Sequence, residues 1–288
     1  MKFTKMHGIG NDYVYINCVE GTDGAEVVEE SFAPRLAELL SDRHFGIGSD
    51  GLILIRPSQT ADFCMEMYNA DGSRGAMCGN GIRCVAKYVY EHGLTNMTTL
   101  KIETLSGIKT VGLTVSNGKV TMVKVEMGIP MLTSNCREIP LNHELADPSC
   151  VWEEIEAGGQ KYRMICISMG NPHAVLFLDD MRQAEVEKLG PLIENHPRFP
   201  DRTNVEFVVV HGRDQLEMRV WERGSGETLA CGTGACASTA AAALAGLADR
   251  SVNMRLLGGN LKIYWNPETS QVEMSGPATE VFRGEINL

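Results

Sequence analysis

Residues 77–84 read MCGNGIRC and residues 230–236 read ACGTGAC, so a Cys-Gly-x-Gly sequence occurs twice in this chain. Each copy opens a segment with a helical pattern, and each segment closes on a glycine. Glycine commonly follows the last residue of a helix because it adopts the left-handed conformation at no steric cost. The two stretches therefore predict helices over 80–93 and 232–246, each beginning beside a cysteine.

The sequence around the two cysteines also repeats. A shift of 153 residues relates Cys78 to Cys231 and relates further pairs in the same order, and a shift of 160 relates two Gly-Asn pairs. The recurring order is a Gly-Asn pair before a strand, a middle strand, a polar turn and the cysteine helix, which indicates an internal repeat. The related pairs are Tyr68-Asn69 with Trp221-Glu222, Gly51 with Asn204, and Gly10-Asn11 with Gly170-Asn171.

Short apolar runs rich in Val, Ile and Tyr dominate the rest of the chain and predict strands. Helical pattern is scarcer: we expect a helix over 31–46, with Ser31 as its N-cap and Gly46 as its end, and a broken helix over 184–196. These elements predict an α+β fold with mostly antiparallel strands. The predicted strands cover 13–17, 51–55, 110–115, 119–127, 173–178, 204–210, 215–221 and 261–265.

The repeat also predicts the domain organisation. We expect the boundary between the halves near Gly128-Ile129-Pro130, just before the second copy begins. Residues 276–288 have the pattern of a strand that returns to the first half. The predicted domains are therefore 1–128 plus 277–288, and 129–276.

Composition places the chain among globular proteins and disfavours anionic partners. The 288 residues carry a net charge of −11, which repels nucleic acid and anionic membranes. Neither a signal-peptide core nor a membrane-spanning apolar run is evident. The nine cysteines include no Cys-x-x-Cys pair, which favours free thiols in a reducing compartment over disulfides or a zinc site. We expect a cytoplasmic protein that binds neither nucleic acid nor membrane.

A cysteine at the start of a glycine-rich helix suits acid–base chemistry. The first N–H groups of a helix point outward, and its dipole favours a carboxylate or phosphate there. The same field favours thiolate over thiol, so we expect each cysteine to have a lowered pKa. Two such thiols on opposite faces of one carbon, one a thiolate and one a thiol, could remove a proton and return it with inversion.

The chain contains six motifs in this order: HGIGNDYV (7–14), RHFGIGSDG (43–51), NADGS (69–73), MCGNGIRC (77–84), GNPHAV (170–175) and WERGSGETLACGTGA (221–235). Together they resemble the diaminopimelate epimerase family, and the resemblance covers nearly the whole chain in the family's order. It implies two similar domains, each a curved sheet around a central helix, with the active site in the cleft between them. It also implies two-base epimerisation of LL- to meso-diaminopimelate in lysine and peptidoglycan biosynthesis, with no pyridoxal phosphate or other cofactor and no metal.

The resemblance also assigns roles to individual residues. Cys78 and Cys231 are the two catalytic acid/base groups, and His173 and Glu222 tune the pKa values of the thiols. Backbone N–H groups bind the reacting carboxylate, and amides, a carboxylate and a guanidinium hold the rest of the amino-acid substrate. The backbone groups belong to Gly79, Asn80, Gly232 and Thr233, and the side chains are those of Asn11, Asn69, Asn171, Asn204, Glu222 and Arg223.

One position departs from the family pattern. Some members carry Gln where this chain has Gly51, and the repeat pairs this position with Asn204, so Gly51 is left off the site. The preceding turn, residues 46–51, matches G-x-G-x-x-G, but a predicted helix precedes it and a strand follows it. This order is the reverse of a dinucleotide-binding loop, so we interpret the segment as a turn.

Two other functions fit the same residues. A proline-type amino-acid racemase would keep the two thiols but would not need Arg223 or so many asparagines. A redox or binding protein would use the facing thiols as a reversible disulfide. The repeat supplies both thiols within one chain, so a homodimer is allowed but not required. The other cysteines, which we expect to be small buried side chains, are Cys18, Cys64, Cys84, Cys136, Cys150, Cys166 and Cys236.

Overall fold

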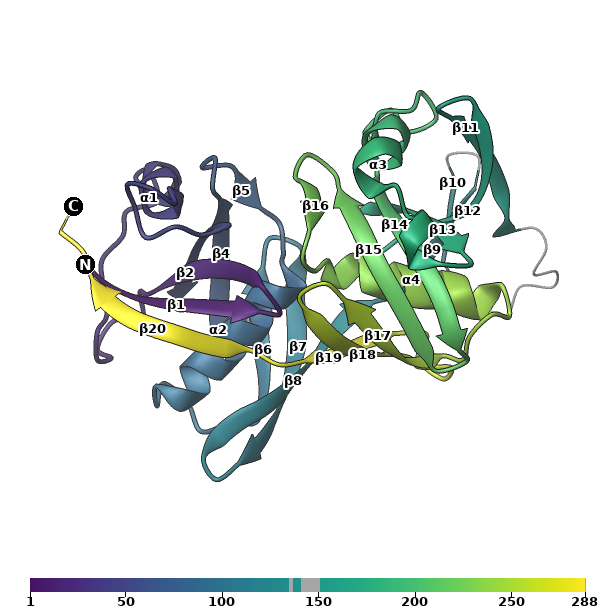
Figure 1. Cartoon of the computed structure of the whole chain (residues 1–288). Helices are drawn as coiled ribbons and strands as arrows, with labels where there is room; N and C mark the ends of the chain where they lie inside the picture. Colours follow the sequence, from purple (N-terminus) through teal and green to yellow (C-terminus); the bar gives the residue numbers. More distant parts are fainter. Residues whose placement is uncertain (135–136, 141–150, 288) are drawn as a thin grey trace. The chain divides into compact units, whose positions relative to one another are not determined.

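The structure is a computed structural model that describes residues 1–134, 137–140 and 151–287. The chain forms two compact units (Figure 1): Met1–Val125 together with Gly276–Leu288, and Glu126–Ser275. Both units combine many strands with few helices, which confirms the predicted α+β class. Cys136 and Cys150, expected to be buried, lie outside the described residues.

Strands of the first unit are mostly antiparallel. Their order is β20-β1-β2-β3-β4-β6-β7-β8, with parallel pairing between β2 and β3 and between β4 and β6. The short strand β5 pairs with β4. The strands are β1 (Lys2–Gly8), β2 (Asn11–Asn17), β3 (Gly51–Arg56), β4 (Phe63–Asn69), β5 (Arg74–Gly75), β6 (Thr99–Thr104), β7 (Gly107–Ser116), β8 (Lys119–Gly128) and β20 (Thr279–Glu285).

The second unit repeats this order of strands. Its sheet runs β9-β12-β13-β14-β15-β17-β18-β19, again with two parallel pairings, β13 with β14 and β15 with β17. β10 pairs with β9, β11 with β12 and β16 with β15. The strands are β9 (Met131–Ser134), β10 (Arg137–Pro140), β11 (Glu153–Ala157), β12 (Gln160–Ser168), β13 (Pro172–Leu178), β14 (Asn204–Gly212), β15 (Gln215–Glu222), β16 (Gly226–Thr228), β17 (Ser251–Leu256), β18 (Gly259–Trp265) and β19 (Val272–Gly276).

One long helix packs against the sheet in each unit. In the first unit α2 (Gly79–Glu91) contacts β1, β2 and β7, and in the second α4 (Gly232–Leu244) contacts β12, β13, β14, β17 and β18. Both helices were predicted from the cysteine motifs. Gly93 and Gly246, two residues past the respective helix ends, have φ angles of 74° and 72°, the left-handed conformation expected of a glycine that ends a helix.

A shorter helix covers the other face of each sheet. Because side chains alternate along a strand, Val14 and Leu52 point to α1 (Ala33–Ser41), whereas Ile53 points to α2. In the second unit Leu176 and Phe207 belong to the core on α3 (Val186–Glu194). Each sheet therefore lies between a long helix that begins at a cysteine and a short helix on the opposite face.

The predicted limits of the first helix were wrong. Ser31 is not its N-cap: α1 begins at Ala33, and no side chain caps it. Proline has no N–H and fits the first turn of a helix, so Pro34 fixes the start there. The helix ends at Ser41 rather than near Gly46, because the Asp42 carboxylate accepts the next backbone N–H groups and forms a turn.

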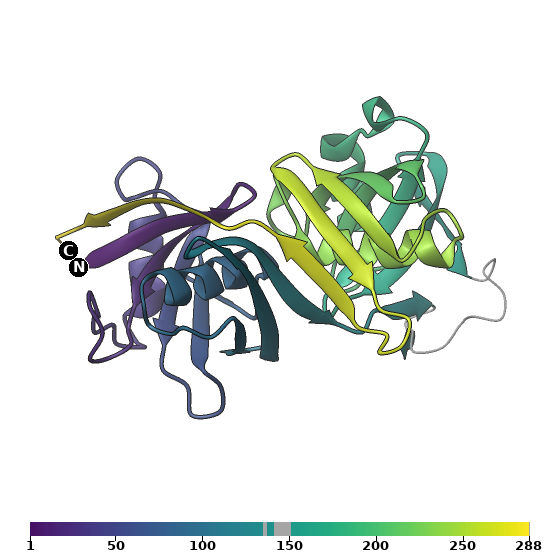
Figure 2. The same ribbon diagram turned by 90° about the horizontal axis from the view of Figure 1, so that it is seen from below.

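The tail strand β20 returns to the first unit, as the sequence predicted. It pairs antiparallel with β1 and lies beside it in both views (Figure 1 and Figure 2). The amino group of Met1 donates to the carbonyl of Ile286 at 2.7 Å, which ties the beginning of the chain to its end. Within the part of the chain that the structure describes, we find no helix long and apolar enough to cross a membrane.

Helix α4 tests how tightly the second unit is packed. Ala240, Ala241 and Ala242 are all fully buried, so consecutive positions on every side of the helix face protein. We expect Ala241→Leu to lower the free energy of unfolding by about 1–3 kcal/mol, because added methyl groups have no space in a close-packed core. Chemical denaturation measures this change. Ala243→Leu, on the same helix but partly exposed, should change it by about 0.5 kcal/mol or less, and equal losses would contradict the packing.

Candidate active site

Each cysteine of the repeat is the N-cap of its helix. The sulfur of Cys78 accepts the backbone N–H of Gly81 at 3.3 Å, and the sulfur of Cys231 accepts that of Gly234, also at 3.3 Å. Both cysteines have extended backbone angles, and neither helix carries an acidic residue in its first turn. The sulfur thus takes the place usually held by a Ser or Asp oxygen and satisfies one of the first N–H groups of the helix.

An ordered chain of hydrogen bonds surrounds Cys78. Its thiol donates to Oδ1 of Asn11 at 3.2 Å, and Nδ2 of Asn11 donates to Oδ2 of Asp50 at 2.8 Å. The other carboxylate oxygen of Asp50 accepts from Nη2 of Arg43 at 2.9 Å. Asp50 therefore fixes the Asn11 amide with its oxygen toward the sulfur. The sequence analysis did not assign Asp50 or Arg43, although both lie in the RHFGIGSDG motif.

Cys231 lies in a more buried and more acidic setting. Its exposed fraction is 5%, whereas Cys78 is half-buried. Burial raises the pKa of the Cys231 thiol well above its usual range, and the carboxylates of Glu222 and Glu206 raise it further. The lowered pKa expected from the helix terminus is therefore wrong for Cys231, because desolvation outweighs the hydrogen bond from Gly234. A raised pKa favours the thiol over the thiolate, which suits the acid of an acid–base pair.

Glu222 is close enough to exchange a hydrogen bond with this thiol. The side chains of Glu222 and Cys231 are hydrogen-bonded, and the Thr228 hydroxyl also donates to the Glu222 carboxylate. Burial raises the pKa of Glu222. The structure thus brings together Cys231 and one of the two residues expected to tune it.

The other residue expected to tune the thiol, His173, belongs to a series of hydrogen-bond contacts that leads to the same sulfur. Its Nδ1 is 2.6 Å from Oε1 of Glu206 and its Nε2 is 3.1 Å from Oδ1 of Asn171. Nδ2 of Asn171 donates to the Thr233 hydroxyl at 3.3 Å, and that hydroxyl is 3.5 Å from the sulfur of Cys231. Four of the expected site residues therefore form one network with a carboxylate, Glu206, that the sequence analysis missed.

Amides of three other expected residues already have protein partners. Asn204 accepts the backbone N–H of Arg223 at 2.9 Å and donates to the carbonyl of Pro172 at 2.8 Å, so it holds the Arg223 loop. The Asn80 side chain accepts from Nη2 of the buried Arg83 at 2.9 Å. The exposed Asn69 donates to the Ser73 hydroxyl at 2.9 Å.

Arg223 is exposed, whereas Gly79 and Gly232 are buried at the starts of their helices. The Nη1 atom of Arg223 donates to the carbonyl of Asp201 at 3.2 Å. Gly79 and Gly232 are the first residues of α2 and α4, where N–H groups have no carbonyl partner within the helix.

Packing explains why Gly51 has no side chain. A Cβ atom at this position would overlap the carbonyl of Tyr68 and lie 2.8 Å from the ring of Tyr13. The segment before it forms the predicted turn, with Gly48 at a φ angle of 80°. Of the remaining cysteines that can be described, four are buried as expected, but Cys64 is partly exposed.

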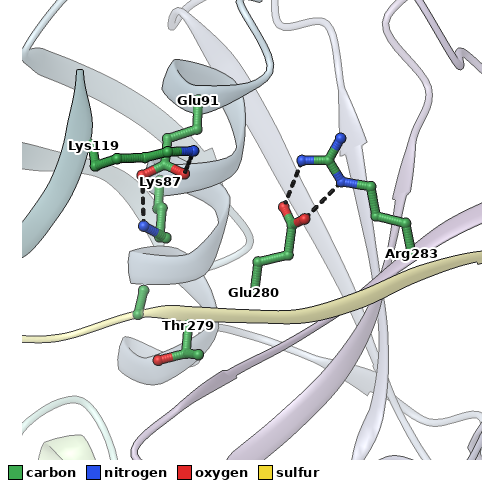
Figure 3. A pocket seen from close by; sticks show the side chains of 7 residues that line it. Lys87, Glu91, Lys119, Thr279, Glu280 and Arg283 are labelled. Atoms are coloured by element: carbon green, nitrogen blue, oxygen red, sulfur yellow. Dashed lines mark hydrogen bonds and ion pairs between the residues drawn. The ribbon is translucent and has the colours of Figure 1, made fainter. Parts of the chain in front are cut away.

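A hollow of about 410 Å³ lies at the other end of α2 from Cys78 (Figure 3). Its cationic groups are paired with acids: Lys87 and Lys119 with Glu91 at 2.6 and 3.2 Å, and Arg283 with Glu280 at 2.6 Å. These pairs leave little charge to attract a carboxylate. Among the residues with described positions, no group of three His, Cys, Asp or Glu side chains is arranged to hold a metal ion.

The family model for diaminopimelate epimerase matches residues 3–133 and 165–281 of the chain. The chain belongs to the diaminopimelate epimerase family. The diaminopimelate epimerase of Acetivibrio thermocellus is 52% identical over 288 residues, covering 100% of this chain and 99% of that relative. That of Methanococcus maripaludis is 50% identical over 291 residues, covering 100% of both chains.

Solved structures of lower identity share the fold. A hydroxyproline epimerase from Agrobacterium vitis has a TM-score of 0.67 at 16% identity, with 99% of this chain and 91% of that chain covered. A phenazine biosynthesis protein of the PhzF family from Bacillus anthracis has a TM-score of 0.68 at 16% identity, covering 100% and 99%. These likenesses confirm the predicted fold class.

The series of hydrogen bonds that links Arg43 to Cys78 predicts a role for Asp50. In Asp50→Asn only one end of the side chain can accept a hydrogen bond, so the variant cannot serve both Arg43 and Asn11 and no longer holds the Asn11 amide against a fixed charged partner. We expect kcat/KM for diaminopimelate to fall about tenfold, the effect of losing a hydrogen bond to a charged group. Steady-state kinetics measure this, with chemical denaturation to follow stability.

Asp62→Asn is the matched control for this variant. Asp62 accepts the backbone N–H of Lys101 at 2.7 Å in the same unit. Its substitution should leave kcat/KM within about twofold of the parent value. Unchanged kinetics in Asp50→Asn would contradict the role of the Asp50–Asn11 pair.

Proposed function

We propose that this chain interconverts LL- and meso-2,6-diaminopimelate without a cofactor, by moving the α-proton between Cys78 and Cys231. The observation that carries the proposal is the equivalent placement of the two thiols, each the N-cap of a helix that begins Gly-x-Gly. Family membership, at about half identity to proteins named diaminopimelate epimerase, supports the choice of substrate.

The proposed reaction uses one thiolate and one thiol. The thiolate takes the α-proton, and the electron pair of the broken C–H bond passes into the α-carboxylate. The N–H groups at the starts of α2 and α4 stabilise this charge, because helix N-termini favour anions. The other thiol then donates its proton to the opposite face of the carbon, so the two cysteines end with exchanged protonation states. The raised pKa of Cys231 supports its role as proton donor in one direction.

The remaining site residues have separate proposed tasks. Gly79, Asn80, Gly232 and Thr233 bind the reacting carboxylate through their backbone N–H groups. The distal amino-acid group is held by a guanidinium, a carboxylate and amides, a set that matches a second carboxylate and ammonium. These side chains are Asn11, Asn69, Asn171, Asn204, Glu222 and Arg223.

The biological setting is also part of the proposal. The activity belongs to lysine and peptidoglycan biosynthesis, and a cytoplasmic location fits thiol catalysis that needs reduced cysteines. The domains 1–128 plus 277–288 and 129–276 each supply one catalytic thiol. A homodimer is allowed but not required.

Isotope exchange tests the reaction directly. Reduced protein is incubated with LL-diaminopimelate in deuterium oxide, without pyridoxal phosphate or metal, and the α-proton is followed by NMR together with product stereochemistry. We expect deuterium at one α-carbon and formation of the meso isomer. Cys78→Ala and Cys231→Ala should each lower the rate about 10²- to 10⁴-fold, the contribution of one acid–base group.

Cys84→Ala is the control, because Cys84 is a fully buried thiol on α2 outside the proposed chemistry. It should retain activity if it folds, which thermal melting checks. Absence of exchange in a folded, reduced sample would overturn the substrate assignment, and proline would be the next substrate to test.

Arg223 distinguishes diaminopimelate from a substrate without a second carboxylate. We expect Arg223→Ala to lower kcat/KM for diaminopimelate about 100-fold, because a two-pronged hydrogen bond to a carboxylate is lost. Arg213→Ala is the matched control, since Arg213 is also exposed in the second unit and pairs with Asp249 at 2.7 Å. Equal kinetics of the two variants would remove Arg223 from the site.

A further inference from the structure

Glu206 is a charged residue in the middle of a buried strand. It lies in the apolar run NVEFVVV of β14, and its exposed fraction is 0%. Its Oε1 atom is 2.6 Å from Nδ1 of His173, whose side chain is also fully buried. Its Oε2 atom has no hydrogen-bond partner within the described part of the chain. A buried carboxylate needs a counter-charge, and the ring of His173 can supply one when both of its nitrogens are protonated.

The hydrogen-bond directions in this network are coupled. A carboxylate only accepts, so Nδ1 of His173 carries a proton. Nε2 is 3.1 Å from the oxygen of the Asn171 amide, and this oxygen can accept a hydrogen bond from Nε2 only when Nε2 carries a second proton, which makes the ring an imidazolium. The amide nitrogen of Asn171 then donates to the Thr233 hydroxyl. That hydroxyl has its own hydrogen left to donate to the sulfur of Cys231, 3.5 Å away.

A neutral His173 would reverse the direction of the hydrogen bonds made by Asn171 and Thr233. With a proton on Nδ1 alone, Nε2 becomes an acceptor, and the Asn171 amide must turn to present its nitrogen to it. The amide oxygen then accepts from the Thr233 hydroxyl, which can no longer donate to Cys231. The charge on Glu206 thus selects between a hydroxyl that donates to the sulfur and one that does not.

The first unit has an apolar side chain, not a carboxylate, at the position equivalent to Glu206. The shift of 153 residues relates Glu206 to Ile53 and Gly234 to Gly81. A methyl group added to Gly234 would lie 2.7 Å from Oε1 of Glu206, and one added to Gly81 would lie 2.7 Å from Cδ1 of Ile53. The two side chains occupy the same position beneath the start of their helices, but only one of them is charged.

We propose that Glu206 is a positioning residue of the Cys231 half of the site: it holds His173 as an imidazolium, and so orients Asn171 and the Thr233 hydroxyl toward the sulfur. This deepens the proposed function and rests on it. Other groups also act on this sulfur: Glu222 from β15, the N–H of Gly234 from α4, and the negative charge of Glu206 itself. Cys166 on β12 also lies in the field of Glu206.

Histidine NMR tests the orientation without depending on catalysis. The whole chain is labelled with ¹⁵N-histidine, and the His173 signals are assigned from the spectrum of His173→Gln. In the parent protein at pH 7 we expect both ring nitrogens of His173 to be protonated. In Glu206→Gln, which keeps the side-chain shape beside Gly234, we expect Nε2 to lose its proton and move to the range of an unprotonated imidazole nitrogen.

Glu217→Gln is the matched control. Glu217 pairs with His211 at 2.7 Å in the same unit but at the exposed end of its strand. This variant should change the His211 signals and leave those of His173 unaltered. A neutral His173 in the parent protein, or a doubly protonated His173 in Glu206→Gln, would overturn the proposal.

Alkylation of Cys231 by iodoacetamide, followed by mass spectrometry of its peptide across pH, gives a second readout. Thr233→Val should raise the apparent pKa of Cys231 in the parent protein, because the thiolate loses a donor. The shift should be smaller in the Glu206→Gln background, where the hydroxyl faces Asn171. Equal shifts in both backgrounds would show that Glu206 does not control the hydroxyl.

Kinetics separate this proposal from the proposed function. We expect kcat/KM for diaminopimelate to fall about tenfold in Glu206→Gln, the effect of losing a charge-assisted hydrogen bond, and to stay within about twofold in Glu217→Gln. If His173 is an imidazolium that depends on Glu206 but the protein does not epimerise diaminopimelate, only the proposed function is overturned. An active protein with a neutral His173 would overturn only the role of Glu206.

Discussion

The hydrogen bond from a glycine N–H to a cysteine sulfur, at the start of a helix, is the contact on which each half of this protein depends. It fixes the sulfur at a point where several N–H groups converge and where the helix dipole favours negative charge. It also requires the sheet to come very close to the helix, since a side chain on Gly81 or Gly234 would collide with β3 or β14. The position of the thiol is thus set by the packing of helix on sheet.

Local signals explain how much of this could be predicted from the sequence. The cysteine helices were found almost to the residue, because the cap at one end and the glycine at the other are both encoded locally. Several strands were missed, among them β6, β12 and β17. Polar residues alternate with apolar ones in β6 and β17, and β12 begins with four polar or aromatic residues, so none of them stands out as an apolar run.

The site was harder to predict where it depends on contacts between distant segments. Asp50 and Glu206 act through neighbours that tertiary structure brings to them, and the parallel pairing of β13 with β14 is what places His173 near Glu206. A charged residue inside the run NVEFVVV was a usable signal, because a buried carboxylate must have a partner. The pKa of Cys231 was predicted in the wrong direction, since the helix terminus is a local effect whereas burial and two neighbouring carboxylates are not.

The return of β20 to β1 has a consequence for how the protein is made. A ribosome releases the residues of the first unit early, and domains generally fold in that order as they emerge. Here the outer edge of β1 stays uncovered until residues 279–285 have been synthesised, after the entire second unit. An uncovered strand edge is a template for pairing with other chains. The nascent first unit must therefore keep an open edge throughout the synthesis of the second, until residues 279–285 emerge and pair with β1.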